Sequence, residues 1–234
     1  MARDELLSGV APGSAAEARV GAFLRGVYGW MAAGLALTAL VAFWVAGSNW
    51  VGILAAHPWL LFALFLAQIG VVITLSAGAS RIAPATATAL FLGYSVLTGV
   101  TLSLVLLVFT RESIASTFAI TAGMFGAMAL YGSTTPRSLA GWGQFLFMGL
   151  IGVVLASVVG FFWHSDALQF LIGFAGVIVF TGLTAYEAQR LKRMALTAPD
   201  GQLGSYTIVG ALSLYLNFVN LFLSLLRFTG SRRG

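Results

Sequence analysis

Seven long apolar runs constrain this sequence more than any other feature. Crossing the hydrocarbon core of a membrane takes about 20 residues in an α-helix, which satisfies its own backbone groups without water. A β-barrel would instead need alternating strands of about ten residues. We therefore predict an all-α polytopic membrane protein, a bundle of seven transmembrane helices. The runs lie at residues 26–46, 59–77, 84–109, 113–131, 141–163, 167–186 and 205–228.

The composition leaves no room for a separate soluble domain. Only 8% of the 234 residues are charged, whereas soluble domains average about 25%. The first apolar run is too long for a cleavable signal peptide, so we expect it to stay in the protein. We divide the chain into a cytoplasmic N-terminal tail (1–24), a transmembrane domain (25–229) and a short basic C-terminal tail (230–234).

The basic residues predict the orientation, because lysine and arginine gather in cytoplasmic loops. With the N-terminus inside, Arg111 is the one basic residue in an outer loop between spans. The net charge of +5 then reflects topology and does not indicate nucleic-acid binding. The inner segments hold Arg3, Arg19, Arg25, Arg81, Arg137, Arg190, Lys192 and Arg193.

Arginines near the C-terminus are the exception to this pattern. Seven crossings place Arg227, Arg232 and Arg233 outside. A re-entrant late segment would return them to the cytoplasm. We favour seven crossings.

Small residues at a spacing of four predict helix packing, since close backbone approach favours association within lipid. Gly152, Ala156 and Gly160 form such a stripe in the fifth run, and Ala122 with Gly126 does so in the fourth. We expect both stripes to be packing seams.

Glu187 is the one acid of seven that directly continues a long apolar run. Ionisable residues against apolar runs are candidates for function, because charge at membrane depth is expensive. One interpretation is an interfacial residue paired with Arg190, three positions on, worth a few tenths of a kcal/mol. The other is a carboxylate that faces the bundle and whose protonation responds to its neighbours. Position alone favours the first.

A polar stripe marks the last run. Asn217 and Asn220 lie three residues apart, and Ser213 lies one turn earlier on the same side. These side chains either join helices by hydrogen bonds, worth about 1 kcal/mol each, or line a polar path through the bundle. The stripe alone does not separate the two interpretations.

Enzyme chemistry finds little support. The chain has no cysteine, which excludes disulfides and thiolate chemistry, and His57 and His164 both fall in predicted outer loops. It shows no phosphate-cradling glycine loop or nucleophile elbow. We expect a protein that is not an enzyme and that holds no cofactor.

Four stretches carry a family resemblance: residues 112–118, 120–128, 180–186 and 211–222. With them the chain resembles the bacterial branch of the transmembrane Bax-inhibitor-motif family, from the first span to the last. The resemblance implies a seven-helix bundle with the last helix central, in the bacterial inner (plasma) membrane. It also implies a pH-sensitive calcium leak.

The resemblance further implies a set of site residues. In the family, two aspartates on the sixth and seventh helices share a proton, and an arginine near the end of the second helix helps to latch the pore. The matching positions here are Glu187, Asn217 and, by a looser match, Arg81. Tyr186 and Asn220 complete the predicted ion pathway.

Asparagine at position 217 changes what the pair can do. An amide cannot take or release a proton, so the like-charge pair that raises one pKa is lost. Glu187, Asn217 and backbone oxygens still offer calcium a weak, transient site. We therefore predict a calcium leak with blunted pH gating, whose partners are the lipid bilayer and calcium ions. The alternative is a non-conducting interaction protein that modulates a membrane-bound quality-control protease, as some bacterial relatives are described.

Overall fold

A computed structural model describes residues 12–78, 81–163 and 165–233. Seven of its helices are long and apolar enough to cross a membrane, which confirms the all-α polytopic fold. The additional helix, α2, is only 7 residues long and replaces a predicted loop. The helices of the described residues are α1 (Pro12–Ala46), α2 (Trp50–Ala56), α3 (Pro58–Gly78), α4 (Pro84–Val108), α5 (Arg111–Thr134), α6 (Ala140–Phe162), α7 (Asp166–Thr197) and α8 (Leu203–Thr229), with a 3₁₀ turn at Asp200–Gln202.

Two helices extend by more than ten residues beyond the predicted spans. Helix α1 begins at Pro12, so residues 12–24 of the expected N-terminal tail are helical, and α7 continues to Thr197. The first turns of α1 are tied to the end of α7, because Arg19 Nε donates to the Ala195 carbonyl at 2.7 Å and Nη2 donates to that of Ala198. Residues 1–11 and 234 of the predicted tails lie outside the described residues.

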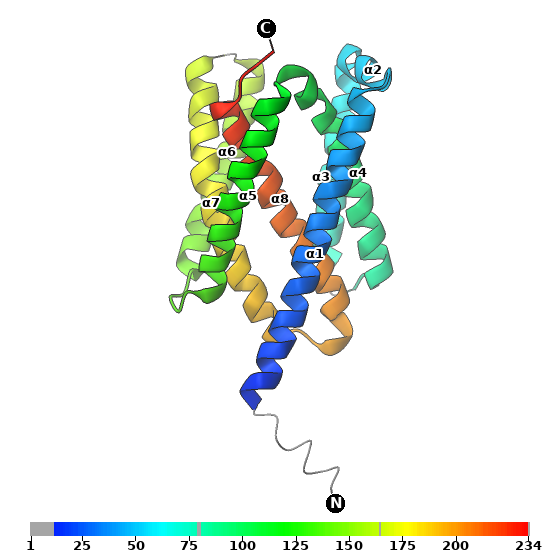
Figure 1. Cartoon of the computed structure of the whole chain (residues 1–234). Coiled ribbons are helices and arrows are strands. Elements are labelled where there is room, and N and C mark those ends of the chain that lie inside the picture. The colour runs from blue at the N-terminus through cyan, green and yellow to red at the C-terminus, as the bar shows by residue number, and fades with distance from the viewer. Residues whose placement is uncertain (1–11, 79–80, 164, 234) are drawn as a thin grey trace, which may run out of the picture.

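Helix α8 occupies the centre of the bundle, as expected for the last span. In its most apolar stretch 72% of the residues are buried, against at most 39% in any other span. Helices α1 and α4 pack together on one side of α8, with α3 against α4. Helices α5 and α7 pack together on the other side, with α6 against α7 (Figure 1). The bundle therefore consists of two helix groups joined through α8.

Aromatic side chains of α8 contact both helix groups. The fully buried Tyr215 ring meets Phe91 and Tyr94 of α4 edge to face, each with ring centroids 5.8 Å apart. One turn further on, the Phe218 ring contacts Phe118 and Phe125 of α5, at 5.3 and 5.4 Å. Such pairs add about 0.5–1.5 kcal/mol each beyond the area they bury.

The two ends of the bundle are distinguished by the helices that begin and end there. Helix α1 begins at one end, and α8 runs the length of the bundle to finish at the other (Figure 1). An odd number of crossings requires this arrangement. The structure therefore favours seven crossings over a re-entrant late segment.

The predicted packing seams are wrong at two glycines. A Cβ added at Gly126 or Gly152 would meet no atom within 4 Å, so these glycines do not mark close contacts. Gly160 does lie against α7, as expected. The tightest approach is at Gly132, where a Cβ would collide with the Ala185 backbone of α7.

Candidate functional site between α7 and α8

Small residues set the register between α7 and α8. Gly176 of α7 packs against Ser224 of α8, and Gly210 of α8 packs against Leu191 of α7. The two contacts run in opposite directions along the chain, so the helices are antiparallel. A residue of α7 and a residue of α8 therefore lie at the same height when their numbers add up to about 400.

Glu187 lies on the side of α7 that faces α8. It follows Gly176 by eleven residues, which is about three helical turns. Only 14% of its side chain is exposed, and Arg190 Nη1 donates to Oε1 at 3.1 Å and to Oε2 at 3.3 Å. The expected ion pair with Arg190 is therefore present, and the carboxylate is also largely buried against the central helix.

Asn217 lies on the side of α8 that faces α7. It is seven residues, about two turns, from both Gly210 and Ser224. The residue is 8% exposed, and its side-chain Nδ2 has no hydrogen-bond partner among the described residues. Burying a donor without a partner costs about 1–3 kcal/mol of stability. The Asn217 amide is therefore able to donate to a ligand or to water.

The register places the two predicted residues on adjacent turns of one interface. Glu187 is level with residue 213, so Ser213 is its neighbour in height. Asn217 lies four residues further along α8, which is about 6 Å along the helix axis. No hydrogen bond joins Glu187 and Asn217 among the described residues.

Arg81 lies outside the interface between α7 and α8. Its side chain is exposed in the connection between α3 and α4. That connection is fixed to the start of α8, because Ser205 Oγ donates to the Ile82 carbonyl at 2.7 Å. Since Glu187 is level with residue 213, it lies about 12 Å deeper along α8 than Ser205. The structure thus pairs Glu187 with Arg190 and does not bring Arg81 to it.

The other two predicted residues are engaged with neighbours of their own. The half-buried Asn220 donates from Nδ2 to the Leu216 carbonyl of its own helix at 2.9 Å. The Tyr186 ring packs over Gly143 of α6. Of the two asparagines in the polar stripe, Asn217 is therefore the one whose buried donor has no partner among the described residues.

Gln189 is a positioning residue that the sequence did not reveal. It lies two residues beyond Glu187 and is buried. Its Oε1 accepts from Leu139 N and its Nε2 donates to the Arg137 carbonyl, both at 2.8 Å. These bonds fix the connection between α5 and α6 to α7. A glutamine in a polar helix end is usually solvated, so no sequence signal distinguished this one.

The sequence also did not predict a cluster of buried hydroxyl groups. Thr38 Oγ1 of α1 lies 2.6 Å from the Tyr215 hydroxyl and donates to the Ser95 carbonyl of α4 at 2.9 Å. The cluster joins α1, α4 and α8. Hydroxyl residues are common in membrane helices, and their pairing depends on tertiary contacts that the sequence does not show.

The described residues contain no group of three histidine, cysteine, aspartate or glutamate side chains that could hold a metal ion. His57 is exposed between α2 and α3, with Nδ1 2.9 Å from the Ile53 carbonyl. His164 lies outside the described residues.

The fold and this interface define a polytopic helical membrane protein with a largely buried carboxylate against its central helix. The chain belongs to the Bax inhibitor family: the family model described as "Inhibitor of apoptosis-promoting Bax1" matches residues 20–234. This finding confirms the resemblance found in the sequence motifs.

Several bacterial relatives are similar over most of their length. The inner membrane protein YbhL of Escherichia coli is 52% identical over 215 residues, which cover 90% of this chain and 92% of YbhL. A protein of Borreliella burgdorferi is 44% identical, covering 91% of this chain and 93% of its own. A membrane protein of Streptococcus pyogenes is 34% identical, covering 89% and 92%.

Proposed function

We propose that this protein is a calcium leak channel whose ion pathway passes Glu187 and Asn217 and whose pH gating is blunted. One observation carries the proposal: Glu187 is largely buried on the side of α7 that faces the central helix. The other acids whose side chains the structure describes, Glu17, Glu112 and Asp166, are exposed. A carboxylate in this setting is the expected mark of an ion pathway.

The interface offers calcium the oxygen ligands it prefers. The Glu187 carboxylate supplies charge, and the Asn217 amide oxygen lies one turn away. Arg190 already neutralises part of the carboxylate's charge, so binding is weak, as a leak requires.

The pH response follows from the number of titrating groups. A pair of carboxylates that shares a proton responds steeply, because each charge opposes the other. Here Glu187 titrates alone, since Asn217 keeps the same charge at every pH. The acid response of the leak is therefore shallow.

The setting completes the proposal. By analogy with YbhL, the chain lies in the bacterial inner membrane, and its distribution of arginine and lysine supports a cytoplasmic N-terminus. It works without a cofactor or an enzymatic step. Its partners are the bilayer and calcium, which is its cargo.

Calcium flux into proteoliposomes at several pH values tests this function. The unmodified protein should conduct with a shallow pH response. Glu187→Gln should reduce both the flux and the remaining pH dependence, whereas Asn217→Asp should steepen the response. Glu17→Gln, which removes an exposed acid from α1, is the matched control and should behave as the unmodified protein.

A full swing between acid and neutral pH in the unmodified protein would contradict the blunted gating. Absence of flux in every variant would favour the alternative, a non-conducting modulator of a membrane protease. To test the alternative, the N-terminal tail is shortened by deleting residues 2–11. A longer deletion, up to residue 24, is less suitable because it also removes Arg19 and its bonds to Ala195 and Ala198.

A further inference from the structure

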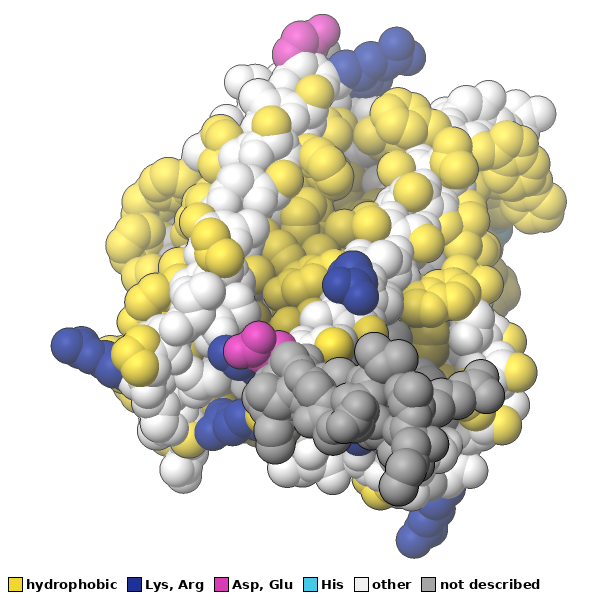
Figure 2. Space-filling model, turned by 60° about the horizontal axis from the view of Figure 1, so that its bottom comes forward, with side chains coloured by type: hydrophobic (Ala, Val, Ile, Leu, Met, Phe, Trp, Pro, Cys, Tyr) yellow, Lys and Arg dark blue, Asp and Glu magenta, His cyan; other side chains and the backbone are white. Residues whose placement is uncertain are grey.

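An apolar hollow opens on the side of the bundle where the two helix groups separate. Helices α1 and α4 form one wall, α5 forms the other and α8 forms the floor. The hollow has a volume of about 100 Å³ and is lined by side chains such as Leu35, Ala39, Leu102, Phe118 and Phe222. Hydrophobic side chains line this hollowed face in the space-filling view (Figure 2).

A second hollow of about 140 Å³ adjoins the first at the end of the bundle where α1 ends. Phe43 and Leu106 line both hollows. The second hollow differs because two arginines, Arg111 and Arg233, form part of its wall. Together the hollows make a groove with an apolar body and a basic mouth.

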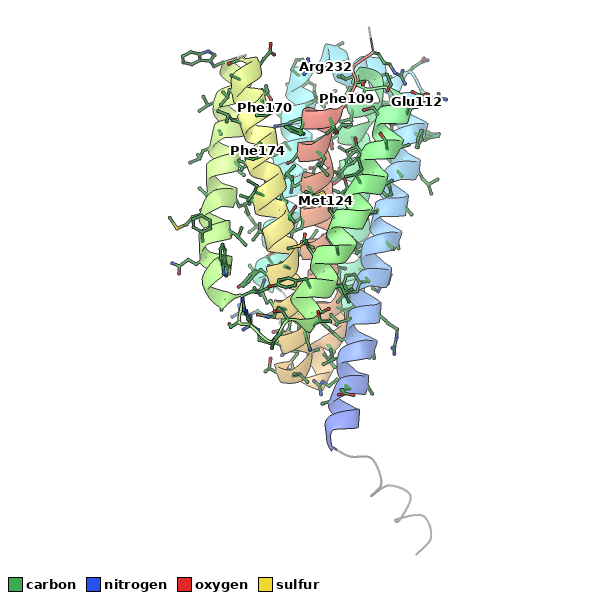
Figure 3. The ribbon with its side chains drawn as sticks, turned by 60° about the vertical axis from the view of Figure 1, so that its left-hand side comes forward. Phe109, Glu112, Met124, Phe170, Phe174 and Arg232 are labelled. Atoms are coloured by element: carbon green, nitrogen blue, oxygen red, sulfur yellow. The ribbon has the colours of Figure 1, made fainter. Side chains whose placement is uncertain are left out.

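The C-terminal residues build this mouth. Arg233 N donates to the Val108 carbonyl at 2.9 Å, Thr110 N donates to that of Ser231 at 3.1 Å, and Arg233 Nε donates to that of Phe109 at 3.1 Å. Phe109, Glu112 and Arg232 lie together at this end of the molecule (Figure 3). Arg233 is therefore held in place by one bond from its backbone N and one from its guanidinium.

Arg111 is available for a ligand. Neither its guanidinium nor the neighbouring Glu112 carboxylate forms an ion pair within the described part of the chain. Arginine matches phosphate geometry with two parallel hydrogen bonds. Two exposed guanidinium groups above an apolar groove are complementary to a molecule with an anionic phosphate head and an apolar tail.

We propose that an anionic glycerophospholipid binds this groove, with an acyl chain between α1, α5 and α8 and its phosphate at Arg111 and Arg233. The groove faces the bilayer, where acyl chains are the available apolar ligand. Basic pockets between transmembrane helices bind anionic head groups on the cytoplasmic side of other membrane proteins, and the same charge complementarity is available at this end. A zwitterionic lipid is the weaker ligand, because its ammonium group offsets the phosphate charge.

The same site accounts for an exception to the charge pattern. Arg111 and Arg233 lie at the end of the bundle where α1 ends, and Arg232 lies at the same end (Figure 3), away from most of the chain's basic residues. Positive charge is depleted at this end in most membrane proteins. A role in holding lipid phosphate gives two of these arginines a reason to be there.

Native mass spectrometry of the full chain in detergent tests the proposal with phosphatidylglycerol and phosphatidylcholine of the same acyl chains. The unmodified protein should bind phosphatidylglycerol more tightly. At about fivefold for each arginine, the double variant Arg111→Gln, Arg233→Gln should lose roughly 25-fold in affinity and with it the preference. Arg232→Gln is the matched control, because Arg232 does not line the groove.

A second pair of variants tests the acyl-chain part. Ala39→Phe fills the groove from an exposed position and should weaken binding of both lipids, whereas Ala36→Phe, exposed on the same helix outside the groove, should not. Equal affinity for the two lipids in the unmodified protein, or an equal loss from Arg232→Gln, would overturn the proposal. Displacement of the lipid by millimolar inorganic phosphate would overturn it in favour of a simple anion site.

Discussion

Gln189 connects the polar end of α7 to the rest of the molecule. Its amide meets backbone groups at both Arg137 and Leu139, so one side chain fixes the connection between α5 and α6. Lys192 adds a bond from Nζ to the Ser133 carbonyl at 3.0 Å. Through these contacts the turn of α7 that carries Glu187 is held against its neighbours.

Replacing Gln189 should therefore destabilise the fold. Gln189→Leu removes both partly buried hydrogen bonds, to Leu139 N and to the Arg137 carbonyl, and we expect the free energy of unfolding to fall by about 0.5–1.5 kcal/mol for each bond. Denaturation of the purified protein in detergent measures this change. Gln169→Leu on the same helix is the control, because its contact with the Gly160 carbonyl is 3.5 Å long and weak. Equal losses in both variants would contradict the role given to Gln189.

At the level of the residue, the sequence predicted part of the candidate site. It identified Glu187 and Asn217, because charge and amide groups are conspicuous in apolar helices, and both lie in the interface between α7 and α8. It did not place Arg81, because the position of a short connection depends on packing at the helix ends. Nor did it identify Gln189, whose burial comes from the connection between α5 and α6.

The helices themselves were predicted well within the apolar runs and poorly beyond them. Helix α7 continues from the predicted end at residue 186 to Thr197, because residues 188–196 are mostly good helix formers and Pro199 is the next breaker. Helix α1 likewise starts at Pro12, a residue favoured in the first turn. Apolar composition reports where a helix crosses the membrane, and it does not report where the helix ends.

Close helix approach was the harder feature to predict. A small residue is necessary for contact between backbones, but the sequence does not show which face meets a neighbour. Gly126 and Gly152 lie open, whereas Gly132 lies against the Ala185 backbone. The seam between α5 and α7 therefore depends on a glycine outside the predicted stripes.

Alanine substitutions distinguish these glycines. Gly132→Ala forces a methyl group into the Ala185 carbonyl, and we expect a loss of about 1–3 kcal/mol in the free energy of unfolding. Gly126→Ala on the same helix meets open space and should leave stability unchanged or slightly raised. Denaturant titration of both variants in one detergent gives the comparison. Tolerance of Gly132→Ala would show that the seam can widen.

In the whole molecule, two helix groups meet through α8 and are tied again at one end. Arg19 of α1 donates to carbonyls at Ala195 and Ala198 of α7, at the end where α1 begins. Near the other end, the apolar groove separates α1 from α5. Closure of the bundle is therefore asymmetric.

Loss of the Arg19 contact should loosen one end of the bundle alone. We expect Arg19→Ala to accelerate hydrogen–deuterium exchange of amides near residues 195–198 and in the first turns of α1, with the core of α8 unaffected. Arg25→Ala removes an exposed arginine from the same helix and is the control. Exchange that stays unchanged in Arg19→Ala would show that other contacts keep this end closed.

The central position of α8 has a consequence for how the protein is made. A polypeptide is synthesised from its N-terminus, so α1 to α7 reach the bilayer before the helix that buries their inner faces. Until α8 arrives, Phe91, Tyr94, Phe118 and Phe125 lack the aromatic neighbours that they have in the finished bundle. The earlier helices are then inserted before the bundle can assemble. Assembly is complete only when α8, the seventh span, has arrived.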